Sequence, residues 1–282
     1  MEYQDNGIFI VGCPRSGTTL LRIILNSHSK VCSGEETGIL SYMDDLFKTR
    51  WKQLQNYNIT EEEFLEEVKK FFLAIHHRYC DITKKSIWVD KTPSHGKHLD
   101  FISRLFPRCK IIHIIRDGRD VAASHKDKWG KKGFYSALYE WISYVRGIRK
   151  FRTKLPGQYF EIKYENLVKN PEKTLKNLLD FLELEWEDRI LKYFSFSHSI
   201  LLEDEVDKNP LKPLQKDRIG SWRKRLSLNE KILVSLGFRN LLIELGYVRG
   251  KQNLFWKKME KNIALIGYLM SRLLCLKERL KK

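Results

Sequence analysis

Apolar runs alternate with amphipathic stretches along most of the chain, and this alternation predicts strands followed by helices. The most continuous run, KIIHII at 110–115, is typical of a strand buried on both faces of a parallel sheet. Shorter runs predict further strands at 7–11, 86–90 and 158–164. Helical spacing of apolar positions predicts helices at 18–27, 60–77, 96–105, 117–127, 134–153, 171–182 and 228–245. The alternation predicts an α/β fold with a central, mostly parallel β-sheet flanked by helices.

The periodicity is lost between residues 195 and 225, and loops of this length are usually functional or mobile. Strong helical periodicity returns before residue 250. We therefore predict a single domain at 1–250 and a separate tail at 251–282.

The tail has the pattern of a basic amphipathic helix. Its apolar residues recur at spacings of three to five and are flanked by many Lys and Arg, the apolar positions being Leu254, Met259, Ile263, Ile266, Met270 and Leu273. One interpretation is a helix lying on a membrane surface. The other is a helix packed on the domain, or on a second copy in a homodimer, and we favour packing because packed amphipathic helices are commoner.

The amino-acid composition indicates that the protein has an anionic partner. The chain has 52 Lys and Arg against 35 Asp and Glu, a formal net charge of +17. Its cysteines are odd in number and widely spaced, so neither a zinc ribbon nor a disulfide framework is expected, the five being Cys13, Cys32, Cys80, Cys109 and Cys275. With no leader-like or membrane-spanning stretch, we expect a cytoplasmic protein, at most peripheral to the inner membrane face through its tail.

The first strand leads into VGCPRSGTTL at 11–20, which has the spacing of a phosphate-binding loop. Gly12 and Gly17 let backbone N–H groups converge on a phosphate at the start of the next helix. Nucleotide-hydrolysing loops place Lys after the second glycine, but here Thr18 stands there and Arg15 is the cation of the loop. The loop therefore suits a phosphate better than a metal-bridged triphosphate, and no metal site is predicted.

Two segments together resemble the sulfotransferases that use 3′-phosphoadenosine 5′-phosphosulfate (PAPS). CPRSGTTLL at 13–21 resembles their 5′-phosphosulfate loop, and IIHIIRDGRDVAASHK at 111–126 resembles their 3′-phosphate motif. Arg116 and Ser124 match the clamp of that second motif. Smaller agreements occur at Lys91 in VDKTP, Tyr164 in IKYENL, and Ser221–Trp222 in IGSWRK. The likeness covers residues 7–247.

The resemblance implies PAPS as sulfuryl donor, adenosine 3′,5′-bisphosphate (PAP) as product, and no metal. It implies a 5′-phosphosulfate site at Arg15, Ser16, Gly17, Thr18 and Thr19, a 3′-phosphate site at Arg116 and Ser124, and further cofactor contacts from Tyr164, Ser221, Trp222 and Arg223. A solvated basic run is the alternative for the segment around Arg223. Asp117, Arg119 and Asp120 are interpreted as mainly structural.

GEET at 34–37 resembles the tyrosylprotein branch of the family, whose second Glu is the catalytic base. A hydroxyl acceptor needs a base during in-line attack, and we predict Glu36, with Lys91 and Arg15 as the catalytic cations. His95 is the alternative base, because His serves in the small-molecule branch. The alternatives without a catalytic role are a solvated carboxylate at a helix start for Glu36 and a surface lysine at a strand end for Lys91.

Two other function classes compete with a sulfotransferase. An atypical P-loop kinase or NTPase is disfavoured by the missing Lys, and a non-catalytic polyanion-binding protein is disfavoured because basic residues are spread along the chain. No nucleic-acid module is recognised, so no nucleic-acid partner is expected. The acceptor is left open among a glycan, a lipid-linked hydroxyl, and tyrosine in an acidic peptide.

Overall fold

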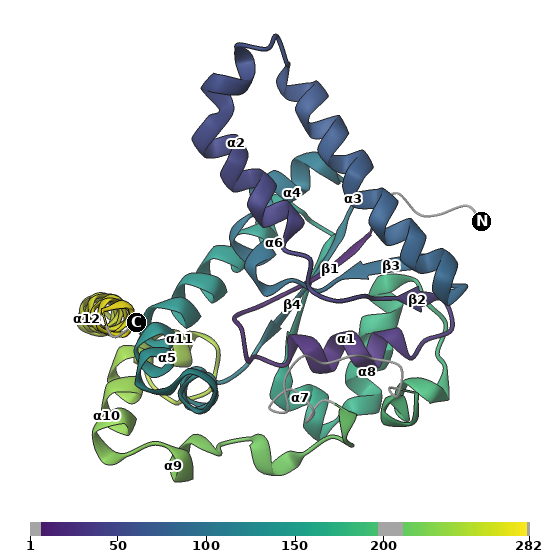
Figure 1. Cartoon of the computed structure of the whole chain (residues 1–282). Helices are drawn as coiled ribbons and strands as arrows, with labels where there is room; N and C mark the ends of the chain where they lie inside the picture. Colours follow the sequence, from purple (N-terminus) through teal and green to yellow (C-terminus); the bar gives the residue numbers. More distant parts are fainter. Residues whose placement is uncertain (1–6, 197–210, 281–282) are drawn as a thin grey trace.

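The structure is a computed structural model that describes residues 7–196 and 211–280. Five strands form one parallel sheet in the order β2-β3-β1-β4-β5 (Figure 1). Their bounds are β1 (Ile8–Val11), β2 (Val31–Cys32), β3 (Ile87–Asp90), β4 (Lys110–Ile115) and β5 (Tyr159–Lys163). The central, parallel sheet of the α/β prediction is thereby confirmed, with β1 between β3 and β4.

Helices cover both faces of the sheet (Figure 1). The helices and short 3₁₀ turns are α1 (Thr18–Asn26), α2 (Ile39–Gln55), α3 (Glu61–Thr83), η1 (Pro93–Lys97), α4 (Leu99–Leu105), α5 (Gly118–Arg149), α6 (Phe151–Lys154), α7 (Tyr164–Lys169), α8 (Pro171–Leu182), η2 (Asp188–Ile190), η3 (Tyr193–Ser195), η7 (Lys216–Arg218), α9 (Trp222–Arg225), α10 (Leu228–Gly237), α11 (Arg239–Glu244) and α12 (Leu254–Arg279).

Strand periodicity divides the core into two layers. Along β1, Ile8 and Ile10 pack on the side of α1, α7 and α8, whereas Phe9 and Val11 pack on the side of α3, α4 and α5. Successive side chains of a strand point to opposite faces, so a strand buried on both sides must be apolar throughout. This is why β1 forms an apolar run, and β4 a nearly unbroken one that His113 interrupts.

Elements outside the sequence-based prediction include β2, α2 and α7, the last of which begins at Tyr164, inside the predicted strand 158–164. β2 is two residues long, and α2 buries only Leu40, Ser41 and Asp44 along its 17 residues, so neither has a strong apolar period. α3 was predicted from the capping box of Thr60 and Glu63, which the structure forms, but it extends to Thr83 instead of residue 77. The α2–α3 pair projects from the sheet at the top of Figure 1.

α5 joins two helices that were predicted separately at 117–127 and 134–153. Trp129 and Gly130 have non-helical backbone inside α5, and Gly130 has φ of +61°. The break falls in the predicted gap because glycine adopts this left-handed conformation without a steric penalty. The irregular stretch predicted at 195–225 lies partly outside the described residues.

The tail forms the predicted helix, α12, which packs against α5 and α10. A Cβ on Gly267 would lie 2.7 Å from the Leu138 Cβ, so glycine permits a close helix crossing. Of the apolar positions predicted to form one side, Ile263 is buried, but Leu254, Ile266 and Leu273 are exposed. Along 7–196 and 211–280, no helix is both long enough and apolar enough to span a bilayer.

The cysteine prediction was wrong for one pair. Cys32 in β2 and Cys80 in α3 form a disulfide across 48 positions of the chain. Neither residue belongs to a recognisable spacing motif, and they meet only because α3 packs beside β2. The structure therefore contradicts the expectation, drawn from cysteine spacing, that the chain has no disulfide.

Candidate active site

The phosphate loop connects β1 to α1 through a tight turn. The Ser16 amide donates to the Cys13 carbonyl at 3.1 Å, and Arg15 and Gly17 have φ of +69° and +101°. A Cβ on Gly17 would lie 2.6 Å from the ring of Tyr164, so this position requires glycine for both backbone and space. α1 begins at Thr18 without a side-chain cap, and its first amides and positive dipole end suit an anion.

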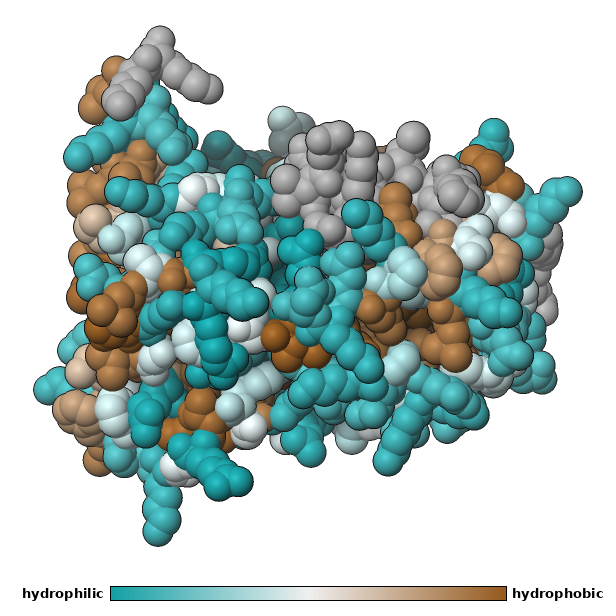
Figure 2. All heavy atoms as spheres, turned by 90° about the horizontal axis from the view of Figure 1, so that it is seen from below, coloured by the Kyte–Doolittle hydropathy of each residue, from teal (hydrophilic) through white to brown (hydrophobic). Residues whose placement is uncertain are grey.

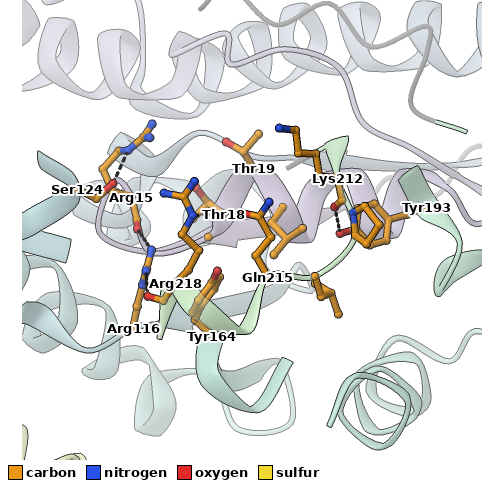
Figure 3. A pocket seen from close by; sticks show the side chains of 14 residues that line it. Arg15, Thr18, Thr19, Arg116, Ser124, Tyr164, Tyr193, Lys212, Gln215 and Arg218 are labelled. Carbon is orange, nitrogen blue, oxygen red and sulfur yellow. Dashed lines mark hydrogen bonds between the residues drawn. The ribbon is translucent and has the colours of Figure 1, made fainter. Parts of the chain in front are cut away.

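A pocket of about 120 Å³ opens at this end of α1 (Figure 3). Its walls come from the loop, the end of β4, α5, α7 and the segment before α9. The lining residues are Arg15, Gly17, Thr18, Thr19, Leu20, Arg116, Ser124, Tyr164, Tyr193, Lys212, Pro213, Leu214, Gln215 and Arg218. Both predicted phosphate motifs and Tyr164 therefore line one pocket.

Arg116 is held in this pocket by a ring contact and two backbone carbonyls. Its guanidinium lies over the Tyr164 ring at 4.3 Å and donates to the Arg218 carbonyl at 2.8 Å and to the Arg15 carbonyl at 3.3 Å. Its Nε and the Ser16 hydroxyl are buried without a hydrogen-bond partner in the described part of the chain. Buried polar groups are normally satisfied, so these donors fit a phosphate-bearing ligand.

Arg15 links the two predicted halves of the site. Its Nε donates to the Ser124 hydroxyl at 3.2 Å, so the loop cation touches the residue predicted to hold the 3′-phosphate (Figure 3). The phosphate loop and the start of α5 therefore form one continuous surface rather than two separate anion sites.

Several pocket residues were missed by sequence reasoning, namely Leu20, Tyr193, Lys212, Pro213, Leu214, Gln215 and Arg218. Most lie in the irregular stretch that was predicted to be functional without individual assignments. The sequence signal for these residues was the presence of cations in that stretch. The family resemblance pointed instead to Ser221, Trp222 and Arg223, a few positions later.

Ser221, Trp222 and Arg223 do not line the pocket. The Asp120 carboxylate instead holds their segment, accepting from the Trp222 amide at 2.8 Å and the Ser221 hydroxyl at 3.1 Å. The Trp222 ring lies against the Arg119 guanidinium at 4.5 Å. Cofactor contact by these three residues stays a prediction, while Asp120 and Arg119 have the structural roles expected of them.

Lys91, at the end of β3, meets two segments that are distant in sequence. Its ammonium pairs with the Glu36 carboxylate and donates to the Thr19 hydroxyl at 3.3 Å. Only 3% of the Lys91 side chain is exposed, against 47% of Glu36. Burial lowers the pKa of Lys91, and the opposing effect of Glu36 does not cancel it. Two of the predicted catalytic residues, Glu36 and Lys91, are thus brought together at the carboxyl edge of the sheet.

Glu35 faces a different cation. The buried Arg22 of α1 pairs with Glu35 at 3.1 Å and also donates to the Gly34 carbonyl. Arg22 therefore anchors the loop that carries Glu36, and the two adjacent carboxylates are separated by their partners.

His95 lies in the core. It is fully buried, and its Nδ1 is 2.8 Å from the Asp90 carboxylate. His98 is also paired, with its Nδ1 2.6 Å from Asp44. Glu36, in contrast, combines partial exposure with direct contact to Lys91.

A second cavity, of about 530 Å³, adjoins the phosphate loop at Pro14. Its size is typical of small-molecule pockets. α5 and α12 supply its other walls, which are Trp129, Lys132, Gly133, Ser136, Tyr139, Glu140, Tyr144, Ser271, Arg272 and Cys275. Burial raises the pKa of Tyr144, and nearby Cys13, Glu140 and Glu36 act in the same direction.

No group of three or more His, Cys, Asp or Glu side chains in the described ranges is arranged to hold a metal ion.

Comparison with known proteins agrees with the geometry. The sequence model of the Sulfotransferase family matches residues 7–188 of this chain. An uncharacterised protein of Aquifex aeolicus is 32% identical over 236 residues, which are 77% of this chain and 30% of that protein. A putative protein-tyrosine sulfotransferase of Caenorhabditis briggsae is 31% identical over 235 residues, which are 81% of this chain and 79% of that protein.

Among solved structures, the sulfotransferase domain of the Synechococcus PCC 7002 olefin synthase has the same fold. It matches with a TM-score of 0.61 and 25% identity, covering 89% of this chain and 100% of that domain. The chain thus spans a whole sulfotransferase domain but under a third of the Aquifex relative.

Proposed function

The chain belongs to the sulfotransferase family, and from this premise we propose that it transfers a sulfuryl group from PAPS to a hydroxyl acceptor. One observation carries the proposal. Thr19 lines the pocket at the start of α1 and also accepts a hydrogen bond from Lys91, which pairs with Glu36. An anion held at this helix end therefore lies next to a buried cation and a partly exposed carboxylate, as sulfuryl transfer requires.

The pocket residues fit the donor. The loop amides, Arg15 and the start of α1 would hold the 5′-phosphosulfate end, and Arg116 and Ser124 the 3′-phosphate. Lys212 and Arg218 add positive charge to the lining, and the Tyr164 ring supplies an apolar surface. When bound, PAPS supplies an activated sulfuryl group whose leaving group is a phosphate oxygen.

Each catalytic residue has a role that follows from its position. Glu36 accepts the proton of the acceptor hydroxyl, since it is the exposed member of the ion pair with Lys91. Lys91 and Arg15 stabilise negative charge on the departing phosphate oxygen and the equatorial oxygens. His95 is fully buried and bonded to Asp90, which supports Glu36 over His95 as the base.

We propose that the acceptor enters the second cavity, which borders Pro14 and Tyr144. Its aromatic walls, Trp129, Tyr139 and Tyr144, suit a flat or apolar group that carries a hydroxyl. A tyrosyl hydroxyl in a protein is the acceptor we would test first, because the GEET loop resembles the tyrosylprotein branch and the C. briggsae relative is named as a putative protein-tyrosine sulfotransferase. Glycan and lipid-linked hydroxyls are the other candidates.

The test is transfer of radiolabelled sulfuryl from PAPS to a panel containing an acidic tyrosine peptide, a glycan fraction and a lipid extract. Wild type would be compared with Glu36→Gln, and with Glu35→Gln as the matched control. Label that depends on Glu36 in any arm supports the enzyme, and the labelled arm identifies the acceptor.

Donor binding is tested separately. PAP should stabilise the protein without magnesium, which a rise in melting temperature would detect. At PAP concentrations well above Kd, the free energy of unfolding should increase by a few kcal/mol. Stabilisation only by magnesium-ATP would overturn the assignment in favour of a kinase or NTPase.

A further inference from the structure

The outer face of α12 is apolar although nothing in the described part of the chain covers it. Residues at helical spacing along this face are 48–87% exposed, namely Leu254, Phe255, Leu265, Ile266, Leu269, Leu273, Leu276 and Leu280. The 26 residues of α12 span about 39 Å at about 1.5 Å per residue. Apolar side chains gather along the edge formed by α12 at the left of Figure 2. We call this set the α12 outer face.

The inner face fixes the rotation of the helix, so the outer face is not exposed by chance. Glu260 is buried and pairs with Arg146 of α5 at 2.8 Å. Ile263 packs into the core, and Gly267 lies against Leu138. Turning the helix over would break the buried ion pair and bring Lys258 into the core, at a large desolvation cost.

Basic residues accompany the outer face. Six exposed cations lie along α12, namely Lys257, Lys258, Lys261, Arg272, Lys277 and Arg279. Of the two acids in this helix, Glu260 is buried against Arg146 and only Glu278 is exposed. Apolar residues beside an excess of Lys and Arg are the composition of helices that lie in the interface of an anionic membrane.

We propose that α12 docks on an anionic lipid bilayer, lying in the plane of the surface with its outer face among the headgroups. Charge decides between lipid and a second copy of the chain. Each α12 carries six exposed cations and one exposed acid, so two paired α12 helices would repel each other. Anionic lipid headgroups would instead attract the cations. The overall charge of +17 acts in the same direction.

Docking also bears on the acceptor. Ser271, Arg272 and Cys275 of α12 form one wall of the second cavity, so a docked molecule holds this cavity beside the headgroup layer. That consequence rests on the proposed function, because the cavity is an acceptor site only if the protein is a sulfotransferase. The docking itself does not depend on catalysis.

The experiment is co-sedimentation of the full chain with vesicles of phosphatidylcholine alone and of phosphatidylcholine with phosphatidylglycerol. Wild type should bind the anionic vesicles, and added salt should weaken binding because exposed charges are screened. The triple variant Leu265→Gln/Leu269→Gln/Leu273→Gln should lose about tenfold or more in partitioning, since it removes buried apolar area at the interface. The double variant Lys258→Glu/Lys261→Glu should lose the preference for anionic lipid.

The matched control is Ile82→Gln/Leu228→Gln/Ile232→Gln, which removes three apolar side chains that are 49–72% exposed elsewhere on the molecule. It should bind vesicles as wild type does. PAP-induced stabilisation of each variant checks that the domain is folded, and the charge-reversal variant keeps the test decisive if the triple variant does not fold.

Two results would overturn the proposal. One is absence of binding to anionic vesicles, or binding that the triple variant leaves unchanged. The other is a dimer, detected by light scattering, that the triple variant converts to a monomer, because the outer face would then be an interface between two copies. Sulfuryl transfer plays no part in these readouts, so failure of docking and failure of the enzyme are distinguishable.

Discussion

Lys91 and Glu36 form an ion pair although 55 positions separate them in the chain. The lysine is buried at the end of β3, and the carboxylate stands on the loop that Arg22 anchors from α1. The ion pair keeps the carboxylate of the predicted base next to the ammonium of the predicted catalytic cation. The predicted base and the predicted cation therefore act as one unit.

Replacing Glu36 should abolish most of the activity without affecting donor binding. Glu36→Gln removes the proton acceptor but preserves size, so kcat should fall by about a hundredfold to ten-thousandfold. The Kd for PAP should stay near that of wild type. Glu35→Gln is the control, because Glu35 pairs with Arg22 and should give the smaller loss. Equal losses in the two variants would assign Glu36 a role in loop structure only.

The burial of Lys91 should set the alkaline limit of activity. Burial lowers the pKa of Lys91 from its usual value of 10.5, so rising pH removes its charge earlier than that of a surface lysine. The logarithm of kcat/KM should therefore begin to fall at a lower pH than an ordinary lysine would give. Lys91→Arg should move this fall to higher pH, because arginine stays protonated. An unchanged alkaline limb in Lys91→Arg would assign the limit to another group.

Arg116 and Arg223 should differ in their effect on PAP binding. Arg116 lines the pocket, and its Nε is buried without a partner among the described residues, whereas Arg223 lies outside the lining. Losing a charged hydrogen bond costs about 1.5–3 kcal/mol, so Arg116→Ala should weaken PAP binding about tenfold to a hundredfold. Calorimetry should show Arg223→Ala close to wild type. A comparable loss in Arg223→Ala would instead support the sequence-based assignment at residues 221–223.

The disulfide between Cys32 and Cys80 should be detectable and stabilising. Protein unfolded without reductant should leave only three cysteines open to alkylation, since Cys13, Cys109 and Cys275 are free. Cys80→Ser should lower the free energy of unfolding by about 2–4 kcal/mol under oxidising conditions. Cys275→Ser, at a half-buried free thiol, is the control. Five alkylated cysteines would show that the pair is reduced in solution.

Two buried histidines should make the fold sensitive to acid. Burial lowers the pKa of His113 to about 3 and that of His125 to about 4, from a usual value of 6.5. As pH falls from 6.5 toward 4, the unfolded chain binds protons that the folded protein does not, so the free energy of unfolding falls. The loss between pH 7 and 5 should be about 2 kcal/mol for each histidine.

His113→Leu isolates one of these contributions. The variant loses the contact between His113 Nδ1 and the Tyr159 hydroxyl, so its absolute stability falls at every pH. The difference between its urea-unfolding free energies at pH 7 and 5 should nevertheless be about 2 kcal/mol smaller than in wild type. A difference identical to wild type would mean that His113 is protonated in the folded protein.

The secondary structure was predictable where the signal is local. β4 and α8 have the predicted bounds, because a nearly unbroken apolar run and a helix start at Pro171 are features of a few neighbouring residues. β2 and α2 were missed, since a two-residue strand and a mostly exposed helix have little periodicity to detect. The phosphate loop was found for the same reason as β4, as its glycines and its flanking strand and helix are contiguous.

The amino-acid sequence by itself determined the α/β fold, the phosphate loop and the residues of the two phosphate motifs, because these depend on short-range backbone preferences and on contiguous patterns. The tertiary structure decided the surroundings of the two candidate bases, because it leaves Glu36 exposed beside Lys91 and encloses His95 beside Asp90. It also paired Cys32 with Cys80 and turned the leucines of α12 outward. Burial and pairing are set by which elements pack together, and that packing joins residues across distances that no local pattern records.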